Sequence, residues 1–297
     1  MIAIKTDRGW FKFKTWQEVE ELPGYIKDIN PKVIKLKKVM GPYREPELRV
    51  CGLSTCRHKH YKGFIVELED GRVTNIGADC GNTHLGVEFD VQSRQIVRDW
   101  ASQERREAIN SAKNRVEGWQ KECEQLRNGE HGASWLLKQN KAMRDQNNGL
   151  PDTVTRFLQD AVRTGDNSVY TERAATQQER EIAKETGQGN LPFIKENVGT
   201  LTGMAGLSEI NSLRDILAVD LEVHLKILVD LDVESLTDKD LQFWAKWCSE
   251  VDGKIDKVRS IIKDTQRFFT RENIGLLFEM VQGDEGKQVM KFAKQYQ

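Results

Sequence analysis

Residues 50–89, VCGLSTCRHKHYKGFIVELEDGRVTNIGADCGNTHLGVEF, contain three of the chain's five cysteines and three of its five histidines. Cys51 and Cys56 flank a Gly-Leu-Ser-Thr turn. Cys80 and His84 are separated by about one helical turn, a spacing often found between metal ligands. Together these four side chains would complete a closed tetrahedral set, which is typical of structural zinc. The spacing therefore predicts a structural zinc site.

The segment between the two ligand pairs predicts a β-hairpin. In residues 63–77, apolar and polar side chains alternate on both sides of Asp70-Gly71. Asp-Gly between two alternating runs is a strong local signal for a hairpin turn. A cysteine-flanked turn, a hairpin and then a ligand pair that opens a helix is the order of elements in a treble-clef-like zinc module.

Two further histidines are alternative ligands. His58 and His60 lie two residues apart, so both would point to the same face of a strand, and either could replace His84 or Cys51. A catalytic zinc is a third option, because three protein ligands leave a position for water. However, the sequence contains neither His-Glu-x-x-His nor His-x-Glu with Pro-Cys-x-x-Cys. We therefore expect the zinc to be structural.

Size and composition restrict the class of protein. The chain of 297 residues has room for one large domain or two to three small ones. Charged residues make up 31%, and no run of eighteen apolar residues occurs. We therefore expect neither a membrane span nor a secreted protein. An odd number of cysteines, three of them assigned to a metal, favours the reducing cytoplasm over a disulfide framework.

The net charge of −1 hides an uneven distribution. Residues 32–62 are strongly basic, whereas residues 208–256 carry twelve acids against five bases. A basic face beside a zinc module can bind phosphates, although a solvated sheet face explains the same lysines equally well. The candidate nucleic-acid-binding residues are Lys35, Lys37, Lys38, Arg57, Lys59 and Lys62.

The expected fold class is α+β. The first ninety residues predict a hairpin around residues 7–9, a short helix capped by Thr15, and a strand over residues 32–40 that Pro42 and Pro46 end. After Asp90 strand signals nearly vanish, which predicts long, coiled-coil-like helices. The predicted domains are an α+β head with the zinc module (1–90), a helical arm (91–186), a glycine-rich linker (187–206) and a C-terminal helical domain (207–297).

Two apolar rows predict long helices. The first runs from Ile109 to Leu126, and the second follows Thr237 and covers four heptads. The second row can pack within the chain or against a second copy, as a seam for an oligomer or a partner. Its residues are Leu241, Trp244, Cys248, Val251, Ile255, Val258, Ile262, Thr265 and Phe269. Between the two rows, residues 171–185 are so polar that we expect an exposed interaction arm or a poorly ordered segment.

No catalytic constellation is evident in the sequence. It contains no Gly-x-Ser-x-Gly, and the glycines at 199, 203 and 206 are not followed by Gly-Lys-Ser/Thr. His131 and His224 are isolated. We therefore expect a protein that binds a partner and performs no chemistry.

The zinc-module pattern resembles a small module of bacteriophage proteins. Its parts are Cys-x4-Cys, the hairpin and Gly-Ala-Asp-Cys-Gly-Asn-Thr-His-Leu-Gly at residues 77–86. The chain length and the division into a compact head and long helices are similar to the phage inhibitor of the Gabija defence system. This resemblance implies a non-enzymatic, oligomeric inhibitor in the host cytoplasm that surrounds the Gabija nuclease complex and blocks its access to DNA. The alternative is a zinc-containing protein that binds nucleic acid through the basic head.

Overall fold

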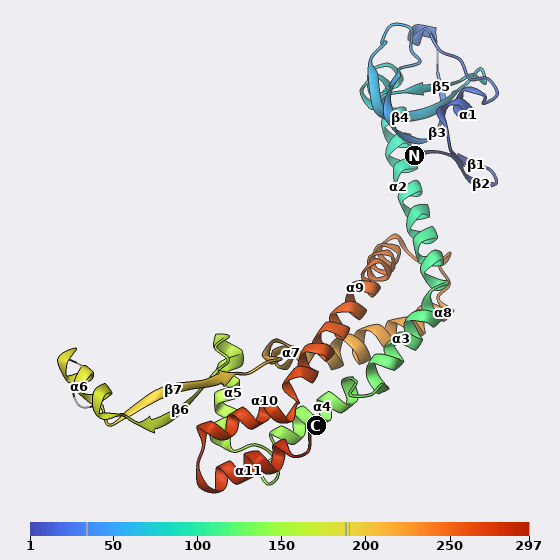
Figure 1. Cartoon of the computed structure of the whole chain (residues 1–297). Coiled ribbons are helices and arrows are strands. Elements are labelled where there is room, and N and C mark those ends of the chain that lie inside the picture. Colours follow the sequence, from blue (N-terminus) through green and yellow to red (C-terminus); the bar gives the residue numbers. More distant parts are fainter. Residues whose placement is uncertain (34, 188, 190, 297) are drawn as a thin grey trace. The chain divides into compact units, whose positions relative to one another are not determined.

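The protein consists of two compact units. The structure, a computed structural model, describes residues 1–33, 35–187, 189 and 191–296. Residues 1–110 and 233–245 form the first unit, and the second consists of residues 111–232 and 246–297. An α+β chain with a small N-terminal sheet and a mainly helical C-terminal region was predicted, and the structure confirms it (Figure 1). The predicted boundaries at 90, 186 and 206 do not coincide with this division, in which the first unit extends to residue 110 and includes residues 233–245.

The first unit is built on a five-stranded antiparallel sheet with the strand order β2-β1-β3-β4-β5. The two predicted hairpin turns, at residues 7–9 and at Asp70-Gly71, are confirmed, and both turns contain a glycine with positive φ. Thr15 caps a short helix, as predicted, by accepting a hydrogen bond from the Glu18 N–H. The elements are β1 Ile2–Thr6, β2 Gly9–Phe13, α1 Trp16–Glu20, η1 Pro31–Val33, β3 Leu36–Val50, β4 Lys59–Leu68 and β5 Val73–Ile76.

Strand β3 differs from its prediction. It begins at Leu36 and not at residue 32, while Ile34 of the predicted strand lies outside the described residues. It then continues through Pro42 and Pro46 to Val50. A register shift between Arg44 and Arg49 leaves residues 45–48 without partners on β4, so Pro46 removes no ladder hydrogen bond. The chain therefore reaches Cys51 at the end of a strand.

Helix α2, Ala78–Lys113, follows β5 directly. Non-helical torsions at Gly86 (φ 68°, ψ −152°) kink it within its first three turns. Beside the kink, Phe89 is fully buried and makes an edge-on contact with Phe64 of β4. This contact helps to hold the first turns of α2 against the sheet.

The second unit is helical apart from one hairpin. It contains the last residues of α2 and most of α9, because both helices pass from one unit to the other. Its elements are α3 Val116–Asn128, α4 Ala133–Met143, α5 Asp152–Thr164, β6 Ser168–Ala174, α6 Gln177–Glu185, β7 Phe193–Thr200, α7 Met204–Glu209, the π-helical η2 Arg214–Leu221, α8 Glu222–Asp230, α9 Asp238–Phe268, α10 Arg271–Gly275, η3 Leu276–Met280 and α11 Gly283–Ala293.

The first predicted long helix is interrupted. Residues 114–115 form a turn between α2 and α3, although Ile109 and Trp119 on either side of it are both buried. Within the second unit, the Trp119 indole N–H donates to the Asp252 carboxylate at 2.8 Å, and Arg115 bonds the same carboxylate. The predicted row therefore belongs to the core, but its residues lie on two helices, α2 and α3.

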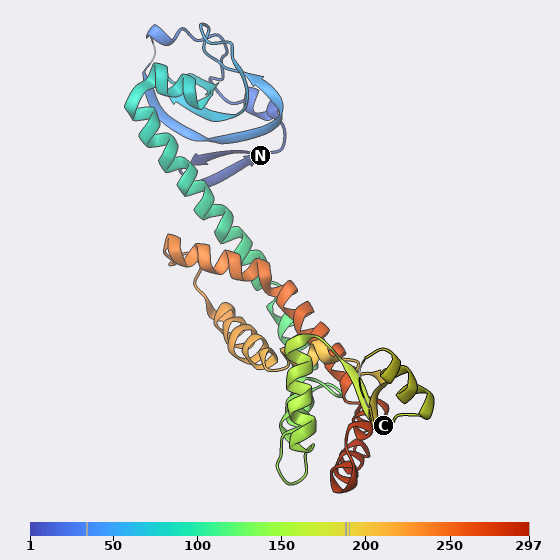
Figure 2. The same ribbon diagram turned by 90° about the vertical axis from the view of Figure 1, so that its left-hand side faces the viewer.

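The β6–β7 ribbon was not predicted. Seven residues of β6 pair with β7 in antiparallel register, and α6 connects the two strands (Figures 1 and 2). Because β7 lies within residues 187–206, the prediction of a glycine-rich linker is wrong for residues 193–200, while Gln188 and Asn190 lie outside the described residues. The polar segment 171–185 forms the end of β6 and an exposed helix with a complete Thr176/Glu179 capping box.

The second predicted long helix is α9, and its apolar row lies in the protein's own core. Each member of the row is at most 8% exposed within a single chain. The alternative that this row forms an oligomer or partner seam is therefore wrong, because these side chains already pack against the chain that carries them. The buried row comprises Leu241, Trp244, Cys248, Val251, Ile255, Val258, Ile262, Thr265 and Phe269.

A search of the described residues found no helix with both the length and the apolar character needed to cross a membrane.

Truncation of the α9 row tests whether it packs within one chain. We expect Ile255→Ala to lower the free energy of unfolding by about 2–5 kcal/mol, because it leaves a cavity in the core. The exposed Val223→Ala should change it by about 0.5 kcal/mol or less. Urea unfolding gives both values, and size-exclusion chromatography should show an unchanged assembly state. A changed assembly state with unaltered unfolding would contradict this assignment.

Candidate metal centre

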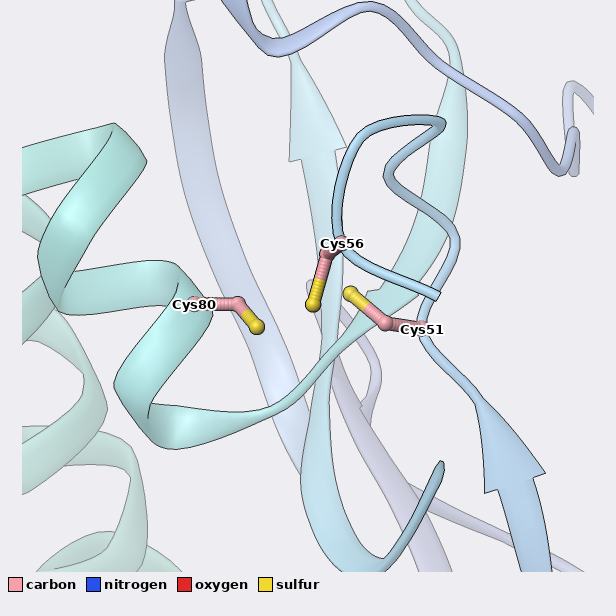
Figure 3. A group of neighbouring side chains, drawn as sticks. All are labelled: Cys51, Cys56 and Cys80. Carbon is pink, nitrogen blue, oxygen red and sulfur yellow. The ribbon is translucent and has the colours of Figure 1, made fainter. Parts of the chain in front are cut away.

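Three cysteines from separate parts of the first unit meet at one point. Cys51 follows β3, Cys56 lies in the connection to β4, and Cys80 is in the first turn of α2. Their sulfur atoms point toward one another (Figure 3) and all lie within 4.8 Å of one another. The three cysteines are therefore close enough to hold a metal ion, as their spacing predicted.

The turn that carries Cys51 and Cys56 is held by backbone hydrogen bonds. The Cys51 N–H donates to the His58 carbonyl at 2.9 Å, and the Cys56 N–H donates to the Leu53 carbonyl at 3.2 Å. Leu53 is fully buried. At Gly52 a Cβ atom would lie 1.9 Å from the Thr74 hydroxyl oxygen, so only glycine lets the turn pack on β5. Local backbone contacts thus fix the positions of both cysteines.

A polar network behind the turn connects it to β5. The Asn75 amide donates to the Val50 carbonyl at 2.9 Å and to the Tyr43 hydroxyl at 3.2 Å, and it accepts from the Tyr25 hydroxyl at 2.8 Å. Burial raises the pKa of both tyrosines, so their hydroxyls stay protonated. Sequence reasoning missed this network. Its only local signal is an amide, Asn75, at a fully buried strand position.

The three thiols do not ionise alike. Burial raises the pKa of Cys51, although the Leu53 and Gly77 N–H groups favour its thiolate. Burial and the neighbouring Cys56 raise the pKa of Cys80. Burial also acts against the Cys56 thiolate, but hydrogen bonds with Cys80 and with His58 outweigh it, so the pKa of Cys56 is lowered. Of the three cysteines, only Cys56 has a pKa shifted in favour of the thiolate. A bound cation would stabilise the thiolate of all three.

The structure separates the three candidate histidines. The Nδ1 atom of His58 lies 3.3 Å from the Cys56 sulfur, because Arg57 adopts a left-handed conformation (φ 45°) that turns the chain back. His60 instead bonds the Tyr43 hydroxyl through Nδ1 at 2.9 Å, and its buried Nε2 has no hydrogen-bond partner among the described atoms. His84 is exposed on α2.

The predicted four-ligand set is thus only partly brought together. Among the described residues, the group whose ligand atoms all lie within 4.8 Å contains the three cysteines and no histidine. His84 is four residues after Cys80, about 6 Å farther along the axis of α2. His58, which the sequence offered as an alternative, is the histidine in contact with the group.

The six basic residues predicted to bind nucleic acid fall into two sets. Lys37 and Lys38 both pair with Glu67, at 2.6 and 3.3 Å, and Lys35 lies 4.0 Å from Glu69. Hydrogen bonding to Lys37, more than to Lys38, holds the pKa of Glu67 below its usual value. In the part of the chain that the structure describes, the exposed Arg57, Lys59 and Lys62 form no ion pair.

The different ionisation of the cysteines predicts a reactivity order. After treatment with a chelator, we expect iodoacetamide at pH 7 to alkylate Cys56 first, because its lowered pKa leaves the largest fraction of thiolate. Cys123 and Cys248 should react much more slowly than Cys56, since both are buried and burial raises the pKa of each to about 11. Peptide mass spectrometry gives the order, and urea-unfolded protein, in which all five should react alike, is the control. Equal native rates at Cys56 and Cys123 would refute this order.

Comparisons of the chain with protein-family models, curated proteins and solved structures found no match. The chemistry of the site is therefore argued from its own residues. Thiolates are soft ligands that select zinc, Cu(I) or iron–sulfur chemistry over magnesium or calcium. What the fold builds here is a three-cysteine group able to hold a metal ion.

Proposed function

We propose that Cys51, Cys56 and Cys80 bind one zinc ion, with His58 as the fourth ligand. In a tetrahedral site with sulfur at about 2.3 Å and nitrogen at about 2.0 Å, a sulfur and a nitrogen ligand lie about 3.5 Å apart. The observed separation of 3.3 Å between the Cys56 sulfur and His58 Nδ1 is close to this value. Three thiolates and one imidazole leave no open position, so the zinc is structural.

The fold context supports a structural role. The cysteines come from the end of β3, from a turn and from the start of α2, so one ion would tie together segments that are far apart in sequence. The order of turn, β4–β5 hairpin and helix matches a treble-clef-like module. Three of the four proposed ligands are thiolates, which are typical of structural zinc sites.

Replacement of single ligands tests the zinc site. We expect about one zinc per chain in the wild type and loss of zinc in Cys80→Ser, measured by elemental analysis of native protein. Loss of an outer-shell partner of a metal ligand lowers metal affinity by roughly 10–100-fold. Because His58 is proposed as a direct ligand, His58→Ala should lower zinc affinity by more than this. His84→Ala is the matched control and should retain zinc. If His84→Ala loses zinc while His58→Ala keeps it, the ligand assignment is wrong.

We further infer that the chain works by binding another protein. The observation that carries this proposal is the β6–α6–β7 arm, residues 168–200, which exposes Tyr170 (43%), Ile182 (58%) and Phe193 (59%). Large contiguous apolar patches on a surface mark interaction sites. Ion pairs of Arg173 with Glu179 and Glu196 connect the helix and both strands of the arm, so these side chains have a defined support.

The resemblance to the phage inhibitor of the Gabija system suggests the partner. On this proposal the chain is a non-enzymatic, viral anti-defence protein in the host cytoplasm, and it assembles as a homo-oligomer. Several copies of the arm would then contact one nuclease complex. Binding through several copies of the same contact raises the overall affinity for the complex, although each single contact is unchanged.

A specific observation also favours the alternative of nucleic-acid binding. Arg57, Lys59 and Lys62 are exposed near the cysteine group and form no ion pair within the described residues. Lys35, Lys37 and Lys38, in contrast, pair with acids of β4 and the following turn, which lowers the positive potential they offer to phosphates. The basic surface is thus smaller than the sequence suggested, and this function ranks second.

Inhibition of a purified Gabija nuclease complex tests the partner. We expect the wild-type chain to bind the complex and suppress DNA cleavage, and native mass spectrometry should show more than one copy bound. The double variant Ile182→Asp/Phe193→Asp should lose binding, because the charges would be buried without partners. Val87→Asp, at a position 80% exposed in the first unit, is the matched control and should inhibit normally.

Two outcomes would count against the proposal. One is a wild-type chain that leaves cleavage unchanged. The other is direct binding of duplex DNA at about 50 mM salt that is lost by about 200 mM salt, which indicates phosphate contacts. If Arg57→Ala/Lys59→Ala abolishes that DNA binding, the nucleic-acid function replaces the inhibitor function.

A further inference from the structure

We propose that the first unit contains a binding site for a small organic anion with a flat apolar body. The site is a pocket between β3, β4 and α2, and we call it the β3–β4–α2 pocket. Its lining includes Arg44, Lys62, Phe64, Val97, Trp100 and Glu104. The inference does not depend on the metal or on the proposed inhibitor function.

The pocket has the size and walls of a ligand site. Its volume is about 650 Å³, within the range of about 300–1,000 Å³ that is usual for small-molecule sites. Phe64, Val97 and Trp100 supply apolar and aromatic wall, and Val97 is half-exposed where it faces solvent. Every lining residue belongs to residues 1–110, so the first unit forms the pocket by itself.

Two cations stand opposite each other at the pocket. Arg44 of β3 and Lys62 of β4 are direct register partners, and both side chains are exposed. Like charges in this position destabilise a sheet unless an anion separates them. Neither side chain forms an ion pair with a residue that the structure describes, and the adjacent Glu45 is already paired with Arg49.

One acid, Glu104, also lines the pocket. Its single negative charge does not balance the two positive charges of Arg44 and Lys62, which lie side by side on the β-strand wall. An anionic group bound between these two cations would receive charge-assisted hydrogen bonds from both strands.

Trp100 gives the pocket a fixed aromatic wall. It is 4% exposed, and an edge-on contact with Trp10, whose ring centroid lies 4.8 Å away, holds its ring in place. The flat body of a ligand would pack on the part of Trp100 that lines the pocket, beside Phe64 and Val97.

The ligand class follows from the two cations and the apolar wall. An anionic group pairs with Arg44 and Lys62, and a flat apolar body covers Phe64, Val97 and Trp100. The phosphate of a nucleotide and the carboxylate of an aromatic acid share this chemistry. The pocket is a small-molecule site, since its volume holds a ligand of that size.

The test uses the full-length, metal-loaded chain and the fluorescent anion 8-anilinonaphthalene-1-sulfonate. We expect saturable binding at one site per chain, weakened about ten-fold or more in Arg44→Ala/Lys62→Ala, because two charge-assisted contacts are lost. Arg8→Ala/Lys14→Ala removes the same charge from exposed positions outside the pocket lining and should bind as the wild type does. Circular dichroism confirms that both variants are folded.

Displacement of the dye separates the two ligand types. Displacement by adenosine 5′-monophosphate, but not by adenosine, assigns a phosphate ligand. Displacement by indole-3-acetate assigns a carboxylate. In either case the ¹⁵N-labelled indole resonance of Trp100, identified with Trp100→Phe, should shift. Equal dye binding in the Arg44→Ala/Lys62→Ala variant, or displacement by neither compound, would overturn the proposal.

Discussion

The meeting of three cysteine sulfurs within 4.8 Å is the constraint on which the first unit depends. It requires the end of β3, the following turn and the first turn of α2 to lie at one point, although Cys51 and Cys80 are far apart in the sequence. Three neighbouring thiolates repel one another in a partly buried site, and burial raises the pKa of two of them. A bound cation would turn this repulsion into attraction. The three cysteines are thus close enough to hold a metal ion.

Contacts around the cysteines hold the backbone segments that carry them. Asn75, fully buried in β5, bonds the backbone of β3 and two tyrosine hydroxyls, so the strand that leads to Cys51 is held from behind. Gly52 allows the turn to lie on β5, and the left-handed Arg57 returns the chain so that His58 contacts Cys56. Such outer contacts orient ligands and add to metal affinity. The cysteine group and the sheet are thus parts of one packing arrangement.

The second unit follows a different physical rule. Its core depends on the continuous apolar row of α9, and indole donors reinforce the packing: Trp119 donates to Asp252, and Trp247 donates to Asp220. Because that row is buried, its side chains are not free to contact a partner, whereas the β6–α6–β7 arm exposes Tyr170, Ile182 and Phe193. The first unit has another kind of free surface, the pocket at Arg44 and Lys62, where these two cations lie beside an apolar wall.

Local patterns in the sequence determined the features that depend on neighbouring residues: the cysteine spacing, the hairpins at residues 7–9 and 70–71, the Thr15 cap and the α9 row. Periodicity and turn chemistry act over a few residues, so the sequence alone specifies them. Only the tertiary structure decided that β6 pairs with β7, that Lys37 and Lys38 share Glu67, and that His58 rather than His84 contacts a cysteine. Each of these depends on contacts between distant segments or on a single backbone torsion, which no sequence period encodes.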